Sequence, residues 1–339
     1  MPRLWNFLDL STPERRANPA LGQTPTEFSP NEPSECLCAL SDWGVIHVHG
    51  ADAAAFLHSQ LSNDIQSLDT ANARLAAYCN AKGRALALLR VLRTDAGLLL
   101  FTHKALTDSL IRRLRMFVLR SKVTLDDVSE AIGVIGLVGA AARPPLQRLM
   151  GSLPEQVGGV QNADEIRLIR LDCVPDRFAL VVPGRLLPEL WARLANTLPV
   201  VSSEAWRLLE IRAGIPTITP ATQEAFVPQM LNLEPLQGIS YSKGCYPGQE
   251  VIARMHYLGK LKRRMYRLHT QTATAPAPGE IVRAGTGGQE AGTVVTAAQA
   301  TPESCELLAV LRIELAEQNS LLLNGAPLQP LELPYSFDT

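Results

Sequence analysis

The stretch GISYSKGCYPGQEVIAR, residues 238–254, is too irregular to form one helix or one strand. Three of its residues interrupt regular backbone pairing: Gly244, Pro247 and Gly248. Apolar residues return in the EVIAR segment, which predicts that the chain re-enters a helix or a strand after a turn. The sequence therefore predicts a turn that carries Cys245.

Cys245 is a candidate reactive thiol. Gly244 permits a backbone shape that points amides at an anion, and Lys243 adds a positive charge nearby. Both features lower the pKa of a thiol and raise its thiolate fraction. A buried structural cysteine is the alternative, because free cysteine is among the most buried residue types. These residues alone leave both interpretations open.

The composition bounds the class of protein. The chain has 339 residues, 46% hydrophobic and 19% charged, which indicates more than one core. A net charge of −1 gives no global basic field, so a nucleic-acid partner would have to bind a local patch. The longest apolar or glycine run, residues 131–142, is too short to span a bilayer. With no secretory signal and no disulfide framework among six cysteines, we expect a cytoplasmic protein that does not enter membranes.

The chain after residue 35 is predicted to mix helices with strands. Its strands alternate with helices, some in adjacent pairs, which indicates an α+β layer of the split βαβ kind. Residues 104–119 predict the clearest helix, because apolar and basic residues occupy opposite arcs. From residue 260 onward, short strands recur between glycine and proline turns, which is typical of a small β-barrel or sandwich.

Two cysteines and two histidines form a candidate metal site. Cys36 and Cys38 share one strand face, as do His47 and His49, and a hairpin could bring the pairs together. The spacing matches none of the usual zinc patterns, and polar alternation explains the histidines equally well. We predict no metal site.

Two basic stretches, on the predicted helix 104–119 and at residues 259–267, are candidate RNA contacts, although either could be an ordinary solvated face. The second stretch also has Tyr257 and Tyr266 nearby, and aromatic rings interleaved with cations can hold phosphates and stack on bases. The candidate contacts are Arg112, Arg113, Arg115, Lys262, Arg263 and Arg264.

The segment KGCYPGQEVIARMHYLGKLKR resembles the signature of the YgfZ proteins, relatives of the aminomethyltransferase (T protein) of the glycine cleavage system. Other segments fall in the family's order, and the resemblance runs from about residue 36 to the C-terminus. They are GADAAAFLHSQLSNDI, YCNAKGRALALLRVLR, RAGIP, FVPQMLNLEPLQGISYSKG and LPYS. The Lys-Gly-Cys-Tyr-x-Gly-Gln-Glu motif is highly specific, whereas the Gly-x-Asp-Ala helix start is not.

The resemblance implies an α+β fold with three domains around a central cavity. The expected parts are a flexible leader, a discontinuous folate-binding domain, a ferredoxin-like α+β domain and a C-terminal small β-barrel. In that order they cover residues 1–35, 36–102 with 203–255, 103–202, and 256–335.

The resemblance also implies site residues. The family's folate-contacting tryptophans match Trp43 and Trp206, and an indole is a suitable stacking partner for a pterin. Without the family, both would be assigned to the core. The motif positions are Lys243 and Cys245 as thiolate support and thiol, with Gly244, Tyr246, Gly248, Gln249 and Glu250.

Two departures from the family pattern concern catalysis. Ala87 and Leu88 stand where the glycine cleavage enzymes carry an Asp-Asp pair, and neither side chain can handle a proton. Arg212 stands where those enzymes have a glutamate that grips the pterin, so this cofactor-binding position is expected to meet a carboxylate or phosphate instead. Whether the chain is an enzyme stays open; it is not expected to be a glycine cleavage enzyme.

The expected function is that of a folate-binding accessory protein. The resemblance implies support of iron–sulfur cluster maintenance and, through iron–sulfur enzymes, of tRNA modification. We expect tetrahydrofolate or another folate as cofactor, iron–sulfur enzymes or assembly proteins as partners, and a monomer. The alternatives are a folate-dependent one-carbon transferase and a direct tRNA-binding module.

Overall fold

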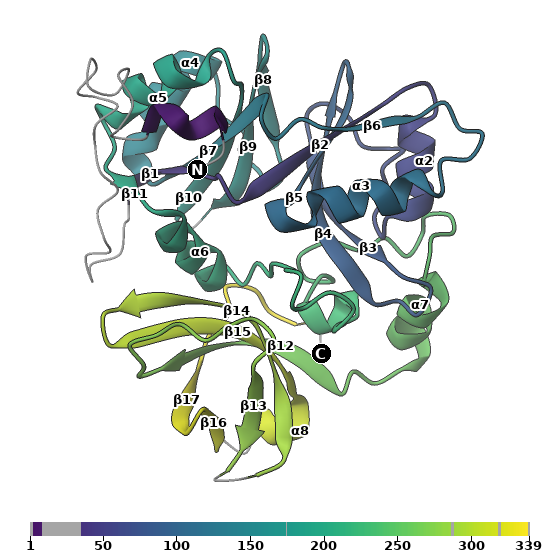
Figure 1. Cartoon of the computed structure of the whole chain (residues 1–339), viewed down its shortest axis with the longest axis vertical. Helices are drawn as coiled ribbons and strands as arrows, with labels where there is room; N and C mark the ends of the chain where they lie inside the picture. Colours follow the sequence, from purple (N-terminus) through teal and green to yellow (C-terminus); the bar gives the residue numbers. More distant parts are fainter. Residues whose placement is uncertain (1–2, 9–34, 174, 286–287, 318–319, 338–339) are drawn as a thin grey trace. The chain divides into compact units, whose positions relative to one another are not determined.

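The computed structural model describes residues 3–8, 35–173, 175–285, 288–317 and 320–337. The chain divides into two compact units, and Figure 1 labels their helices and strands. The first comprises Met1–Ala53, Leu68–Ala73 and Val91–Trp206, and the second comprises Ala54–Ser67, Arg74–Arg90 and Arg207–Thr339. The predicted leader falls in the first unit, and residues 9–34 of it lie outside the described residues.

The first unit contains a six-stranded sheet with the order β11-β1-β7-β10-β9-β8. Its pairing is antiparallel except between β1 and β11. The strands are β11 (Val200–Val201), β1 (Cys36–Ala39), β7 (Ile132–Val138), β10 (Asp176–Pro183), β9 (Ile166–Cys173) and β8 (Val160–Ala163).

Both faces of this sheet are covered, which explains the nearly continuous apolar sequence of β7. Ile135 and Leu137 face a core that also holds side chains of α4 (Arg143–Met150) and α5 (Leu187–Ala195). Gly136, between them, faces Trp206 of α6 (Ser203–Arg212) instead. A short 3₁₀ helix at Arg3–Leu8 adds buried Trp5 and Phe7 to the same core, so this part of the predicted flexible leader is packed.

A five-stranded sheet has the order β3-β4-β5-β2-β6. The strands are β3 (Ala73–Cys79), β4 (Ala85–Thr94), β5 (Gly97–His103), β2 (Trp43–His49) and β6 (Thr124–Asp127). The boundary between the two units falls within β4, between Arg90 and Val91. Helix α2 (Ala53–Gln60) follows β2 in the chain.

The strands β1 and β2 do not form the hairpin that would gather two cysteines with two histidines. Both edges of β1 are occupied by β11 and β7, and β2 pairs with β5 and β6 in the other sheet. The prediction that a hairpin could unite these four side chains is therefore wrong. Among the described residues, no group of three His, Cys, Asp or Glu side chains is placed to hold a metal ion.

The helix predicted over residues 104–119 is shorter in the structure. A 3₁₀ turn at Lys104–Leu106 leads into α3 (Thr107–Arg115), and turns follow up to Arg120. Leu119 has φ 46°, in the left-handed region, so a helix could not continue through it. The apolar pattern extended the prediction too far, because Phe117 matches the helical period but is exposed.

The second unit contains a closed barrel with the order β12-β15-β14-β13-β16-β17, so the predicted C-terminal β-barrel is confirmed. The strands are β12 (Arg263–Thr270), β15 (Ser304–Arg312), β14 (Glu290–Thr301), β13 (Ile281–Ala284), β16 (Leu321–Leu323) and β17 (Ala326–Leu331). Leu268, Val282 and Leu307 lie in its core, with the short helix α8 (Ile313–Ala316) packed against it. No helix in the described part of the chain is long and apolar enough to cross a membrane.

Candidate functional site

The opening stretch forms an irregular loop, as the sequence predicts, and it leads into a helix, one of the two alternatives that the sequence left open. Helix α7 (Gln249–Leu258) begins directly after Gly248. Gly248 has φ 80°, and a side-chain carbon there would lie 2.5 Å from the Asn80 carbonyl oxygen. Only glycine fits both restrictions, so this residue closes the loop against the segment after β3.

Lys243 is buried and points into the protein. Its ammonium donates hydrogen bonds to the backbone carbonyls of His58 and Leu61, the latter at 2.8 Å, and lies 4.6 Å from the Tyr246 ring centroid. Burial lowers the pKa of Lys243 to about 8, against the opposing charges of Asp64 and Cys245. The lysine therefore joins the loop of residues 238–248, here called the motif loop, to the end of α2. It carries a positive charge at neutral pH.

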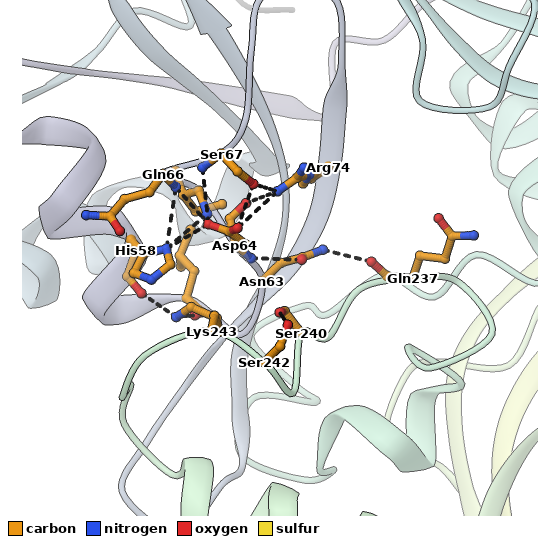
Figure 2. Close-up of polar contacts among 12 residues, drawn as sticks. His58, Asn63, Asp64, Gln66, Ser67, Arg74, Gln237, Ser240, Ser242 and Lys243 are labelled. Atoms are coloured by element: carbon orange, nitrogen blue, oxygen red, sulfur yellow. Dashed lines mark hydrogen bonds and ion pairs between the residues drawn. The ribbon is translucent and has the colours of Figure 1, made fainter.

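A histidine and a carboxylate complete this cluster (Figure 2). His58 Nδ1 lies 3.0 Å from Asp64 Oδ1, and Asp64 Oδ2 accepts a 2.6 Å hydrogen bond from Ser67 Oγ. That hydrogen bond is the main cause of the lowered pKa of Asp64, which keeps the carboxylate charged at neutral pH. Burial, and then the charge of Lys243, lower the pKa of His58. His58 is therefore mainly neutral at pH 7.

Cys245 is exposed, whereas the other described cysteines whose side chains are placed are buried: Cys36, Cys38, Cys79 and Cys305. Burial raises the pKa of Cys36 and of Cys79 to about 12, so those thiols stay protonated. A methyl group on Gly244, next to Cys245, would lie 3.8 Å from His58 Nε2. The exposed thiol thus sits on a loop flanked by a buried ammonium and an imidazole.

The other motif residues support the loop. Tyr246 is buried beneath the Lys243 ammonium, and burial raises the pKa of its phenol. Gln249 and Glu250 lie in the first turn of α7, where a carboxylate is favoured by the helix dipole. The described contacts of the lysine are with backbone carbonyls and the Tyr246 ring rather than with Glu250.

The two candidate folate tryptophans belong to different elements of the first unit. Trp43 begins β2, is half-buried, and lies with its ring centroid 5.9 Å from that of Phe101. Trp206 is 2% exposed, packs on Gly136, and has the Arg177 guanidinium carbon 5.7 Å from its ring centroid. Its indole N–H is buried and has no acceptor within the part of the chain that the structure describes.

Arg212, the third candidate, ends α6 and forms an ion pair within the second unit. Its Nε and Nη2 donate to Glu306 Oε1 at 3.0 and 2.8 Å, and Arg267 donates to the other carboxylate oxygen at 3.0 and 2.7 Å. The pairing with a carboxylate that the sequence suggested for this arginine is thus made inside the protein. A role of Arg212 toward folate stays a prediction.

Some of the predicted RNA-contacting side chains are exposed, whereas others already bind groups within the protein. Arg112 and Lys262 are exposed, whereas Arg113 and Arg263 are half-buried. Two others are engaged internally: Arg115 Nη2 donates to the Leu125 carbonyl at 2.5 Å, and the Arg264 guanidinium carbon lies 4.0 Å from the Phe337 ring centroid.

The pairing of His58 with Asp64, and of Lys243 with the end of α2, was missed by sequence reasoning. No periodic pattern connects residues 58–64 with residue 243, because the contact forms across 182 and 185 positions of the chain.

Comparison with known proteins defines the class first. Residues 32–174 match the GCVT N-terminal domain family. The glycine cleavage system aminomethyltransferase T from Bartonella henselae has the same fold, with a TM-score of 0.64 and 15% identity over 90% of this chain and 87% of that chain. The α+β aminomethyltransferase-like fold with its C-terminal barrel is therefore confirmed.

The particular family follows from sequence identity. The chain is 32% identical over 295 residues to the tRNA-modifying protein YgfZ of Colwellia psychrerythraea, covering 86% of this chain and 88% of that protein. It is also 32% identical over 305 residues to the tRNA-modifying protein YgfZ of Yersinia pestis, with coverage of 88% and 92%. The chain belongs to the YgfZ family, as the motif indicated.

Proposed function

We propose that the chain is a folate-binding accessory protein that supports iron–sulfur enzymes and, through them, tRNA modification. Its chemical group is the thiol of Cys245. The observation that carries the proposal is the placement of this thiol: it is exposed on the family motif, with Lys243 and His58 beside its loop. The tRNA link is supported by relatives named tRNA-modifying proteins.

The thiol is exposed and therefore accessible to a partner molecule. The sulfur of a cysteine can attack electrophiles or bind iron. Lys243, two residues earlier, keeps its ammonium in the protein interior, where both of its described hydrogen bonds go to carbonyls of the chain. Cys245 acts in one of these two ways, as nucleophile or as iron ligand.

Two features of the tryptophans support the proposed binding of folate. The buried indole N–H of Trp206 has no acceptor among the described residues, and such a donor is stabilised when a ligand supplies one. Trp43 is only half-buried and offers a ring for stacking. A bound folate would supply a flat pterin and a carrier for one-carbon units; Trp43 and Trp206 would hold it.

A one-carbon transferase is less well supported. Ala87 is buried and Leu88 half-buried on β4, at the positions where the glycine cleavage enzymes carry acids. The protein is proposed to work in the cytoplasm as a monomer, with iron–sulfur enzymes or assembly proteins as its partners.

Complementation tests the proposal. A bacterial strain lacking its own YgfZ protein would express the wild type, Cys245→Ser or Cys245→Ala, and a nucleoside made by an iron–sulfur tRNA-modifying enzyme would be quantified. Both variants remove the sulfur from an exposed position, so we expect unchanged thermal unfolding and folate binding but loss of the modified nucleoside. Full complementation by Cys245→Ser, with an alkylation rate of wild-type Cys245 no faster than that of a free cysteine, would refute the proposed role of the thiol.

A further inference from the structure

The second unit has a pocket that the proposed function does not use. Its volume is about 580 Å³, within the range of small-ligand sites. Segments from four places in the chain form its walls: the loop after α2, strand β3, residues 237–242 and the end of α7. Figure 2 shows the polar side chains on several of these walls.

One wall carries a fixed pair of opposite charges. Arg74 Nη1 donates to Ser67 Oγ at 2.9 Å and to the backbone carbonyl of Asp64, and it lies 3.9 Å from the Asp64 carboxylate. The carboxylate is itself held by Ser67 Oγ and by the backbone N–H of Gln66 at 3.0 Å. Both charges are thus positioned without a ligand, which reduces the entropy that binding must cost.

The opposite wall offers hydroxyl groups. Ser240 Oγ and Ser242 Oγ lie 3.5 Å apart, and the backbone of Ser240 is anchored by a 2.9 Å hydrogen bond from its N–H to the Ser62 carbonyl. Asn63 holds the two walls together, because its amide donates to the carbonyls of both Leu75 and Gln237 at 2.7 Å. The serine hydroxyls can donate to or accept from a ligand.

An exposed aromatic ring lies at the rim of the pocket, against neighbours that are fixed by their own contacts. Tyr257 is 66% exposed and lies edge-on to His256 and Tyr241, with interplanar angles of 81° and 68°. His256 stacks on Tyr241 at a centroid distance of 3.8 Å, and both bind the Glu234 carboxylate. The neighbours of Tyr257 are therefore rigid, and its exposed ring can stack on a flat ligand at small entropic cost.

Cations flank this ring along the chain. Arg254 lies one turn before Tyr257 on α7, and Lys260 and Lys262 follow the helix; all three are exposed. Cations spaced around an exposed aromatic ring match the alternation of phosphates and bases in a single-stranded nucleic acid.

We propose that this pocket binds one nucleotide of a single-stranded segment of RNA. The base stacks on Tyr257, the ribose hydroxyls bond to Asp64 and the two serines, and Arg74 meets the phosphate. Arg254, Lys260 and Lys262 meet the phosphates on either side. The inference rests on the link to tRNA in the proposed function and names the part of the chain that would contact the RNA.

Fluorescence polarisation with a labelled ten-nucleotide single-stranded RNA and with an unmodified tRNA transcript tests the pocket. Tyr257→Ala is expected to weaken binding about 5- to 150-fold, the range for loss of one stacked base, whereas Tyr257→Phe keeps the ring and the affinity. Leu258→Ala is the matched control, because it truncates the adjacent, even more exposed side chain and should leave affinity unchanged. Lys260→Gln and Lys262→Gln should each flatten the salt dependence by about 0.7 in log–log slope.

Three outcomes overturn the proposal: no RNA binding by the wild type at low salt, equal effects of Tyr257→Ala and Leu258→Ala, or salt-independent binding of AMP as tight as that of RNA. The last would make the pocket a small-molecule site. Complementation by the Cys245 variants is measured separately. Loss of RNA binding together with a failing Cys245→Ser variant would remove the pocket proposal and leave the proposed function standing.

Discussion

Replacing Glu306 with glutamine tests the ion pair that holds Arg212. Glu306 is buried between Arg212 and Arg267 and accepts four N–H···O hydrogen bonds between 2.7 and 3.0 Å. Glutamine keeps one acceptor oxygen but loses the charge, so the two guanidinium groups face a neutral amide in place of a shared carboxylate.

The expected loss follows from these contacts. Removing one partner from a fully buried ion pair costs about 3–5 kcal/mol. The two arginine side chains are 21% and 19% exposed, so water can partly compensate them. We therefore expect Glu306→Gln to lower the free energy of unfolding of the second unit by about 2–4 kcal/mol, or the Tm by roughly 4–16 °C.

Urea denaturation of Glu306→Gln beside Glu303→Gln measures this loss. Glu303 is an exposed carboxylate on the turn between β14 and β15, so its replacement controls for the change in net charge. Equal stability of the two variants would refute the reasoning.

The same ion pair predicts a pH dependence. Burial alone would raise the pKa of Glu306, but hydrogen bonds and charges from Arg212 and Arg267 bring it below its ordinary value. A carboxylate with a lowered pKa in the folded state stabilises the fold above the unfolded pKa, about 4.3, and this contribution is lost as the pH falls through the folded value. The stability difference between wild type and Glu306→Gln should therefore shrink below about pH 4.

Two further predictions concern the tryptophan and the buried lysine. Tetrahydrofolate should quench tryptophan emission, and Trp206→Ala should weaken its binding by about 1–3 kcal/mol, the cost of leaving a buried acceptor without its donor. Unchanged affinity in both Trp43→Ala and Trp206→Ala would argue against the site. The second prediction concerns Lys243, whose proton leaves the folded protein at a lower pH than it leaves the unfolded chain. Relative to Lys243→Met, the wild type should therefore become more stable as the pH increases from about 8 to about 10, as measured by chemical denaturation. Parallel pH profiles of the two proteins would contradict it.

Elements with a strong local pattern could be predicted from the sequence. The barrel strands after residue 260 and the return to regular structure after Gly248 follow from turn residues and apolar patterns, which act over a few positions. The sequence did not decide between a helix and a strand after Gly248. The end of α3 could not be placed, because Phe117 continues the helical period although the chain has already left the helix. The helical spacing of apolar residues indicates which side chains could face a core, but only tertiary packing decides which of them do.

Contacts between residues distant in sequence could not be predicted from local patterns. The strands β1 and β2 are separated by a short turn, yet they join different sheets because other strands already occupy both edges of β1. Arg212 meets Glu306 across 94 positions, and the sequence offers many other acids at such a distance. The chemical type of that partner could be predicted from the donor-only guanidinium, but its identity could not.

The cost of burying Lys243 supports a functional reason for the motif. A lysine whose pKa falls to about 8 destabilises the folded state at pH 7 by an amount on the order of 3 kcal/mol, relative to a lysine left in water. An uncharged side chain would avoid this cost, and the surrounding carbonyls could be satisfied by other donors. The charge is held beside an exposed thiol, on a loop closed by a glycine that no other residue can replace without strain. Strongly perturbed groups concentrate at functional sites because a chemical task repays the lost stability, and Cys245 is the group in this cluster that such a charge would serve.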